Sequence, residues 1–342
     1  MSMLETLERG PRLPVVRTRR FGTTDLETSE VAFGTWALGS DWWGETDDFD
    51  RLIGRALELG VSFFDTGDAY GQGRNEEIVG RALAGVPRES IQIATKFGYV
   101  LESDRRVHAE GERRQDFAPD HLRRALEASL RRLGTDHVDL YQLHNPRMDA
   151  VERDDTFAEL ERLREEGKLR HYGVALGPAI GWRDEGLLAL DRPGVGSLQT
   201  VYNLLEQQPG DDFLARALET GAGIMARVPT SSGLLEGRYT QETTFEGNDH
   251  RRHRRREWLL EGLKKVERLR FLAIEGERTM TQVALKWILQ QPGIASVVPT
   301  VTTVVELEEM AGASAAPDLT EEELDGVAEL YASGFGLEPV QA

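Results

Sequence analysis

The segment that decides the fold is residues 119–146, which read PDHLRRALEASLRRLGTDHVDLYQLHNP. In its first part, Pro119–Leu133, apolar side chains recur at helical spacing, Asp120 lies in the first turn and Gly134 follows the last apolar residue. This pattern predicts an amphipathic helix with a defined start and end. After a short polar turn comes the apolar run Val138–His144, which has the length and composition of a buried strand. A helix followed by a buried strand is the unit from which parallel α/β sheets are built.

The same alternation extends over the rest of the chain. The expected strands are residues 31–39, 61–65, 91–96, 138–144, 171–176, 197–205, 223–228 and 295–299. The expected helices are residues 48–59, 75–83, 119–133, 154–166, 184–190, 211–219, 257–274, 281–290 and 304–310. Eight strands without a linker or a break in composition favour one closed (β/α)8 TIM barrel, of class α/β, over an open doubly wound sheet.

Two further features complete the expected architecture. Extended pieces on either side of a turn at residues 22–25 predict an N-terminal β-hairpin. Long loops at residues 98–118 and 229–256 follow strands, as the loops that build active sites do in barrels. We therefore expect a polar N-terminal leader at residues 1–16 and a single barrel domain at residues 17–342.

Composition excludes several classes of function. The chain has 342 residues, 59 acidic and 41 basic side chains, a net charge of −18 and no cysteine. An acidic protein repels phosphate backbones and anionic lipids, so neither nucleic acid nor a membrane is an expected partner. The lack of cysteine excludes disulfides, thiolate metal sites and cysteine nucleophiles. No apolar run approaches the ~18 residues that span a bilayer, and residues 1–20 lack the apolar centre of a secretory signal. We expect a cytoplasmic globular protein, and the sequence leaves its oligomeric state open.

Four polar residues stand at or just after the ends of successive expected strands: Asp65, Tyr70, Lys96 and His144. In a barrel these strand ends converge on one mouth. A tyrosine hydroxyl is a poor acid at neutral pH unless a nearby cation lowers its pKa, and Lys96 can supply that cation. Asp65 can hold the lysine, and His144 can donate to a carbonyl oxygen. Each residue alone also fits a structural role, as a turn cap, a packed aromatic, a rim charge or a buried histidine. Together they favour a site for carbonyl chemistry.

The neighbourhoods of these residues carry a resemblance to a known family. FDTGDAYG at residues 64–71, ATKFG at 94–98 and DLYQLHNP at 139–146 resemble the aldo-keto reductase superfamily, and the resemblance extends over residues 19–330. It implies an NAD(P)-dependent reductase of aldehydes or ketones that acts on a small carbonyl or sugar-like molecule. It also implies that Tyr70 is the proton donor and that Asp65, Lys96 and His144 complete a catalytic tetrad.

The resemblance further implies a set of contacts to a nicotinamide cofactor. The matching positions, from the nicotinamide end to the adenosine end, are Gly34, Thr35, Trp36, Gln199, Arg227, Ser232, Leu234, Gly237, Arg238, Thr300, Glu306 and Glu309. Residues 34–36 border the nicotinamide, residue 199 contacts it and residue 227 takes the place of the ring that stacks on it. Residues 232–239 resemble the loop over the pyrophosphate, and its backbone donors and Arg238 suit an anion.

Three positions depart from the family pattern. Ala175-Leu176 stand where a Ser-Asn pair usually grips the carboxamide, and Arg227 stands where an aromatic ring commonly stacks, a role that a planar guanidinium can also fill. Residues 299–310 contain no cation, and Glu306 lies where a cation for the 2′-phosphate is often found. A carboxylate there repels a 2′-phosphate and can accept from a ribose 2′-hydroxyl. We therefore expect NADP preference to be weakened, with NAD tolerated or favoured.

Other interpretations stay open at the level of sequence. The run RRHRRR at residues 251–256 fits either a solvated basic face or a phosphate clamp from the cofactor-covering loop. Pairs such as His250 and His253 do not offer three convergent ligands, so no metal is expected. The departures at Ala175 and Leu176 motivate a redox-silent nicotinamide-binding sensor or partner subunit. A retained cofactor would also suit a redox-neutral epimerase or lyase on a sugar-like substrate.

Overall fold

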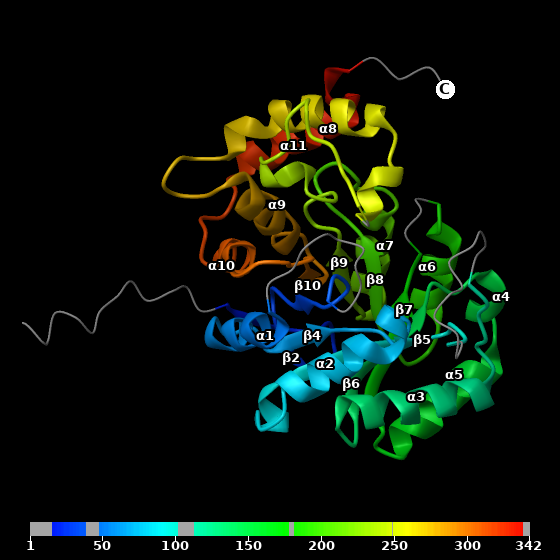
Figure 1. The fold of residues 1–342 in the computed structure, drawn as a ribbon. Helices are drawn as coiled ribbons and strands as arrows, with labels where there is room; N and C mark the ends of the chain where they lie inside the picture. The colour runs from blue at the N-terminus through cyan, green and yellow to red at the C-terminus, as the bar shows by residue number, and fades with distance from the viewer. Residues whose placement is uncertain (1–15, 39–47, 102–112, 178–180, 248, 338–342) are drawn as a thin grey trace, which may run out of the picture.

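A parallel eight-stranded sheet forms the centre of the molecule, in the order β10-β9-β8-β7-β6-β5-β4-β3 (Figure 1). The structure is a computed structural model and describes residues 16–38, 48–101, 113–177, 181–247 and 249–337. The strands are β3 (Phe33–Gly34), β4 (Phe63–Asp65), β5 (Gln92–Phe97), β6 (Val138–His144), β7 (Leu169–Ala175), β8 (Val195–Val201), β9 (Gly223–Arg227) and β10 (Ile294–Val298). Isolated parallel bridges join Val31 to Val297 and Gly34 to Thr300, so the first strand meets the last. The prediction of a (β/α)8 barrel is confirmed.

Helices pack around the outside of the barrel (Figure 1). They are α1 (Phe49–Glu58), α2 (Arg74–Ala82), α3 (Pro119–Leu133), α4 (Met148–Val151), α5 (Asp154–Glu165), α6 (Arg183–Asp191), α7 (Gly210–Thr220), α8 (Arg256–Leu269), α9 (Met280–Leu289), α10 (Val304–Gly312) and α11 (Glu321–Ala332). In α3, Leu122, Leu126, Leu130 and Leu133 are buried, and their spacing of three or four residues gives the helix its one apolar face. Gly134 ends α3 in the left-handed conformation, as its position in the sequence predicts.

The expected hairpin is present and covers one end of the barrel. Strand β1 (Thr18–Arg20) pairs with β2 (Glu27–Ser29) in antiparallel register. Between them Phe21 is fully buried and meets Phe63 of β4 edge-to-face, with ring centroids 5.9 Å apart. Gly22 has φ +56°, and a Cβ there would lie 2.4 Å from the carbonyl oxygen of Gly221, so only glycine fits. The hairpin thus places apolar side chains under the barrel and leaves the opposite end for a site.

Strands β3 and β8 are shorter than predicted. Strand β3 comprises only Phe33–Gly34 of the expected residues 31–39, of which residue 39 lies outside the described residues. Strand β8 ends at Val201, four residues before the predicted end, because Asn203 turns the chain. The Asn203 side chain accepts from the Leu205 amide at 2.9 Å and donates to the Val228 carbonyl at 3.0 Å. Tyr202 and its apolar neighbours are buried in this turn. A short buried apolar run in a turn has the same composition as a strand, which explains the error.

Two helices were not predicted from the sequence. Helix α4 has only four residues, and α11 begins after Thr320, whose side chain accepts from the Glu323 amide while the Glu323 side chain accepts from the Thr320 amide. This capping box marks the start of a helix, but the acidic residues that follow lack the apolar periodicity that predicts one. Residues 1–15 of the expected leader lie outside the described residues, whereas Val16 is buried and donates its amide to the Leu59 carbonyl at 2.8 Å.

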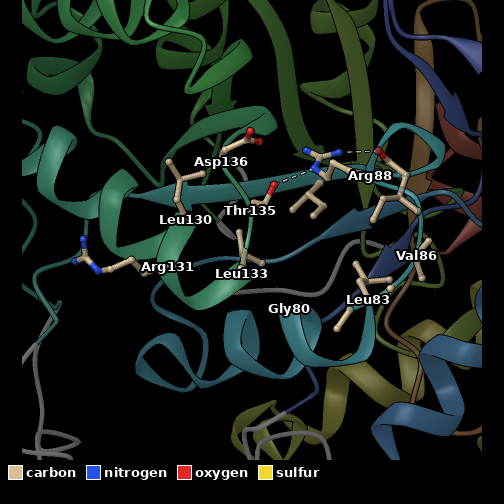
Figure 2. Close-up of a pocket in the computed structure, with 14 residues that line it drawn as sticks. Gly80, Leu83, Val86, Arg88, Leu130, Arg131, Leu133, Thr135 and Asp136 are labelled. Carbon is tan, nitrogen blue, oxygen red and sulfur yellow. Dashed lines mark hydrogen bonds between the residues drawn. The ribbon is translucent and has the colours of Figure 1, made fainter.

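A cavity of about 790 Å³ opens between α2 and α3 (Figure 2). Gly80, Leu83, Leu130 and Leu133 line it, together with Arg88, which precedes β5. It therefore lies beside the amino ends of the strands, whereas barrel active sites are built at the carboxyl ends. Within the described ranges, none of the helices combines the length and apolarity needed to cross a lipid bilayer.

Candidate active site

The four predicted catalytic residues come together at the carboxyl ends of three neighbouring strands. Asp65 is the last residue of β4, Lys96 the fifth residue of the six-residue β5, and His144 the last of β6. Tyr70 opens the short 3-10 helix η2 (Tyr70–Gly73) that follows β4. The parallel register, which pairs Lys96 with Gln142, sets these ends side by side.

Lys96 and Asp65 form a buried ion pair at the base of the site. The Lys96 Nζ donates to the Asp65 Oδ2 at 2.7 Å and to the Thr66 carbonyl at 2.6 Å, and the lysine is only 1% exposed. The other oxygen of Asp65 accepts from Gln199 at 3.0 Å and Gln142 at 3.5 Å. Burial by itself lowers the pKa of Lys96, but Asp65 and the Tyr70 hydroxyl raise it, and the net shift is upward. The ammonium is therefore charged at neutral pH.

Tyr70 lies directly over this charge. The Lys96 Nζ is 4.8 Å from the centre of the Tyr70 ring, and the His144 ring meets the Tyr70 ring edge-to-face at 5.6 Å. Gly67 lies against the ring: a Cβ added there would be 3.4 Å from it, in van der Waals contact. The half-buried tyrosine is thus packed between a glycine, a cation and an imidazole, which fixes its orientation.

His144 is held as a neutral imidazole. Burial, followed by the positive charges of Lys96, Arg227 and Arg113, lowers the pKa of His144 well below 6.5. Its Nδ1 is buried without a hydrogen-bond partner among the described residues. The Tyr99 ring packs edge-to-face against it at 5.0 Å. A neutral imidazole keeps one N–H to donate, so the site offers a donor next to the tyrosine hydroxyl.

Sequence reasoning missed four residues that shape this site. Gln142 reaches Asp65, and its position two residues before His144 on β6 places it on the same face of the strand. That period-two spacing was a usable signal. Tyr99, Arg113 and Gln115 come from the long loop after β5, where no periodicity marks them. The Gln115 side chain donates to the carbonyls of His144 at 2.9 Å and its neighbour at 3.1 Å, so it braces the end of β6.

The predicted nicotinamide contacts on β3 and β8 border the tetrad. Gly34 pairs with Asp65 across β3 and β4, and a Cβ at Gly34 would lie 2.5 Å from the Pro299 carbonyl oxygen. The Thr35 carbonyl accepts from Asn75 at 2.5 Å, and the Trp36 ring meets His250 edge-to-face at 5.0 Å. Gln199, as described above, holds Asp65.

The loop after β9 has an unusual backbone. Ser231 and Ser232 have φ values of 49° and 58°, and Gly233 follows at 94°. Gly237 has φ 70°, and a Cβ there would meet nothing within 4 Å. Non-glycine residues in this region carry strain, which is concentrated at ligand-binding segments. The Ser232 carbonyl accepts from Tyr239 at 2.9 Å and its hydroxyl from Arg254 at 3.2 Å, so this segment is tied to the arginine run. Leu234 of the same loop is buried.

At the predicted adenosine end, Glu306 is paired with Arg238. One oxygen of Glu306 accepts from Arg238 at 2.8 Å, and the other accepts from the amide and hydroxyl of Thr302 at 2.9 and 2.7 Å. Arg238 also contacts Glu236. Glu309 is engaged elsewhere, since its carboxylate accepts from Thr279 at 2.7 Å in front of α9. Of the predicted adenosine-end residues, the structure therefore brings together Arg238 and Glu306.

Arg227 ends β9 and reaches over the mouth. Its guanidinium donates to the Leu176 carbonyl at 2.7 Å, while its Nε is buried without a partner among the described residues. In the 251–256 run, Arg251 binds Asp249 and Tyr239, and Arg254 is the member that contacts Ser232. The described residues contain no group of three or more His, Asp or Glu side chains able to hold a metal ion.

Comparison with known proteins identifies the family of this chain. The model of the Aldo/keto reductase family matches residues 30–332. The uncharacterized oxidoreductase YqkF of Bacillus subtilis (strain 168) is 31% identical over 312 residues, which are 90% of this chain and 94% of that protein. The NADH-specific methylglyoxal reductase of Escherichia coli (strain K12) is 30% identical over 305 residues, 85% of this chain and 91% of that protein. The solved glycerol dehydrogenase AKR11B4 from Gluconobacter oxydans superposes with a TM-score of 0.77 at 28% identity, covering 95% of this chain and 98% of that one. The barrel, the strand-end tetrad and these matches together establish that the chain belongs to the aldo/keto reductase family.

Proposed function

We propose that this protein reduces the carbonyl group of a small aldehyde or ketone to an alcohol, with NAD(P)H as cofactor and Tyr70 as proton donor. One observation carries the proposal: a buried Lys96–Asp65 ion pair lies under the ring of Tyr70, and a neutral His144 stands beside it. A sensor or partner subunit that only binds a nicotinamide has no need to bury a lysine charge at this cost.

The chemistry follows from the charges in the site. A bound reduced nicotinamide supplies the hydride that the carbonyl carbon accepts. The Tyr70 hydroxyl gives its proton to the carbonyl oxygen, and the Lys96 ammonium stabilises the negative charge that develops on the phenol oxygen. His144 donates its N–H to the same carbonyl oxygen and orients it. Its lowered pKa keeps the imidazole neutral, so that Tyr70 and not His144 gives the proton. Asp65 holds the lysine in place throughout.

The residues present fit a dinucleotide. Ser232, Gly233 and Gly237 give the loop after β9 an open, positive-φ backbone, whose amides suit a pyrophosphate. At the nicotinamide end, Arg227 offers a planar guanidinium whose Nε has no partner among the described residues. Gly34 lies close to the Pro299 carbonyl and gives this end a closely packed backbone surface. Arg227 takes the stacking role in place of an aromatic ring.

The cofactor preferred is NADH. Glu306 holds Arg238, the cation that the covering loop brings to the adenosine end, so a 2′-phosphate would meet a carboxylate and an arginine that is already paired. A ribose 2′-hydroxyl has no such conflict and can donate to the carboxylate. The printed name of one relative, an NADH-specific methylglyoxal reductase, supports this preference.

Replacement of Tyr70 by Phe tests the proposal. Tyr70→Phe is expected to lower kcat for aldehyde reduction by at least about 100-fold, because the proton donor is lost while the packing of the ring is retained. The dissociation constant of NADH, measured by quenching of protein fluorescence, is expected to stay within about threefold of the unmodified protein. Turnover at the level of the unmodified protein would refute the role of Tyr70.

A panel of aldehydes, ketones and sugars separates the alternatives. Steady oxidation of NADH with a carbonyl substrate identifies a reductase. Tight NADH binding with no oxidation on any carbonyl identifies a redox-silent binder. Product formation without net oxidation of NADH identifies a redox-neutral epimerase or lyase.

A further inference from the structure

Two arginines beside the tetrad have no acidic partner among the described residues. Arg227 donates to a backbone carbonyl, and Arg113 donates to the Ala69 carbonyl, directly before Tyr70, at 3.3 Å. No ion pair joins either one to a carboxylate in the part of the chain that the structure describes. With the Lys96 ammonium they make three cations whose charge acts on His144.

Arg113 is held in this position by the end of the long loop after β5. Tyr99 and Gln115 form an antiparallel bridge, and the Asp116 amide donates to the Gly98 carbonyl at 2.7 Å. Gln115 then fixes the segment to the His144 carbonyl. The segment that carries Arg113 is therefore fixed by these backbone and side-chain hydrogen bonds.

The carboxylates near the tetrad that the structure describes do not pair with Arg113 or Arg227. Asp65 is already paired with Lys96 at 2.7 Å. Asp68 is fully buried, and burial followed by the charge of Glu76 raises its pKa well above the usual value. Glu76 is itself paired with Arg132 at 2.6 Å. Among the described residues, Arg113 and Arg227 are therefore left without a counter-ion.

The lack of a counter-ion among the described residues contrasts with the net charge of −18 of the chain. A partly desolvated guanidinium without a counter-ion costs free energy, and such groups persist where a ligand supplies the missing charge. Elsewhere on the protein, arginines pair with exposed carboxylates, as Arg55 does with Glu58 and Arg216 with Glu219. Among the described residues beside the tetrad, no carboxylate pairs with Arg113 or Arg227.

We propose that the substrate carries a negatively charged group, a carboxylate or a phosphate, which Arg113 binds next to the carbonyl with Arg227 adding to the positive field. This inference rests on the proposed reductase function and names the class of its substrate. Arginine binds planar oxyanions through two parallel N–H donors, which would also orient the carbonyl toward Tyr70 and His144. The local positive field offsets the repulsion that an acidic protein exerts on an anion in solution.

Matched pairs of substrates test the proposal. Succinic semialdehyde against butanal gives the carboxylate arm, and glyceraldehyde 3-phosphate against glyceraldehyde gives the phosphate arm. In the unmodified protein the anionic member of at least one pair is expected to have a kcat/KM at least about tenfold higher. Arg113→Gln is expected to lower that ratio by about ten- to 100-fold, as the loss of a charged hydrogen bond does. The arm with the larger ratio identifies the group that is bound.

A control variant and a binding measurement keep the two proposals apart. Arg124→Gln removes the same charge from an exposed position on α3 and is expected to leave the ratio unchanged. Calorimetric titration of the NADH-saturated protein with succinate and with inorganic phosphate needs no turnover, and Arg113→Gln is expected to weaken the tighter of the two by about tenfold. If anions bind the unmodified protein and Arg113→Gln loses that binding, but the unmodified protein turns over no aldehyde, the reductase proposal is refuted and the anion subsite is retained. The anion subsite is overturned if the unmodified protein has the same kcat/KM for the anionic and the neutral member of each pair. It is also overturned if Arg113→Gln lowers kcat/KM equally for both members. Weaker NADH binding in Arg113→Gln with unchanged ratios likewise overturns it and assigns the arginine to the cofactor.

Discussion

A neutral imidazole beside a buried ammonium makes His144 the residue whose titration matters most for the site. Burial and three nearby cations lower its pKa in the folded protein, whereas the unfolded chain binds a proton near pH 6.5. Because the unfolded state then binds more protons below pH 6.5, acid favours unfolding. The stability that depends on neutral His144 is fully present above that pH and is lost as the pH falls below it.

Urea unfolding at pH 7.5 and pH 5.5 measures this effect. In the unmodified protein the free energy of unfolding is expected to fall more steeply between the two than in His144→Gln, by up to about 1.4 kcal/mol per pH unit for one proton. His253→Gln, which removes an exposed imidazole, is the control and is expected to keep the slope of the unmodified protein. Equal slopes in His144→Gln and the unmodified protein would contradict the lowered pKa.

The packing of α2 against α3 supports strand β5, which carries Lys96. Glu76 of α2 accepts from Thr95 of β5 at 2.5 Å and from Arg132 of α3 at 2.7 Å. Gly80 of α2 lies beside the end of α3 that carries Leu133 (Figure 2). The helices approach closely because Gly80 has no side chain: a Cβ there would lie 2.6 Å and 2.7 Å from the carbonyl oxygens of Arg132 and Leu133. These are backbone atoms, so the helices themselves would have to separate.

Two glycine-to-alanine variants test this packing. Gly80→Ala is expected to lower the free energy of unfolding by about 1–3 kcal/mol, through overpacking against backbone. Gly54→Ala on α1, where a Cβ meets nothing within 4 Å, is expected to raise it by about 0.5–1 kcal/mol, because alanine favours the helix. Chemical denaturation of both variants gives the two signs. A gain in stability for Gly80→Ala would show that α2 and α3 separate freely.

Helices and strands with strong local patterns could be predicted from the sequence, and the tetrad followed from them. Helix α3 and strand β6 have the predicted bounds, and the ends of β4, β5 and β6 carry the predicted residues. The pairing of Arg238 with Glu306, 68 residues away, left no local signal. The placement of Arg113 likewise depends on how a long loop folds back onto β6. Such contacts depend on tertiary structure, which residue periodicity does not encode.

Ligand binding stabilises the molecule as a whole, since a cofactor that binds only the folded barrel adds its binding free energy to that of folding. At 100 times its dissociation constant, NADH is expected to contribute about 2.7 kcal/mol. For a chain of this length that corresponds to a rise in Tm of about 4 °C.

Thermal unfolding with each cofactor tests the preference for NADH. At the same concentration NADPH, if bound about tenfold more weakly, is expected to give about half the rise in Tm. Glu306→Gln removes the carboxylate that a 2′-phosphate would meet, while Arg238 keeps its contact with Glu236, and this variant is expected to narrow the gap. Glu308→Gln on the same helix, whose carboxylate pairs with Arg55, is expected to keep it. A larger shift with NADPH in the unmodified protein would refute the preference.

The bridge between the first strand and the last affects how the protein is made. The Arg17 amide donates to the Ser314 hydroxyl, 297 residues along the chain, and the Ala32 amide donates to the Val297 carbonyl. A ribosome that adds about 5–20 residues per second needs on the order of 15–60 s to supply these partners. During that interval the edge of β3 that pairs with the end of the chain lacks its hydrogen-bonding partner, and its apolar side chains stay exposed. Chaperones bind such segments. We expect the nascent chain to depend on such protection until its last quarter has been translated.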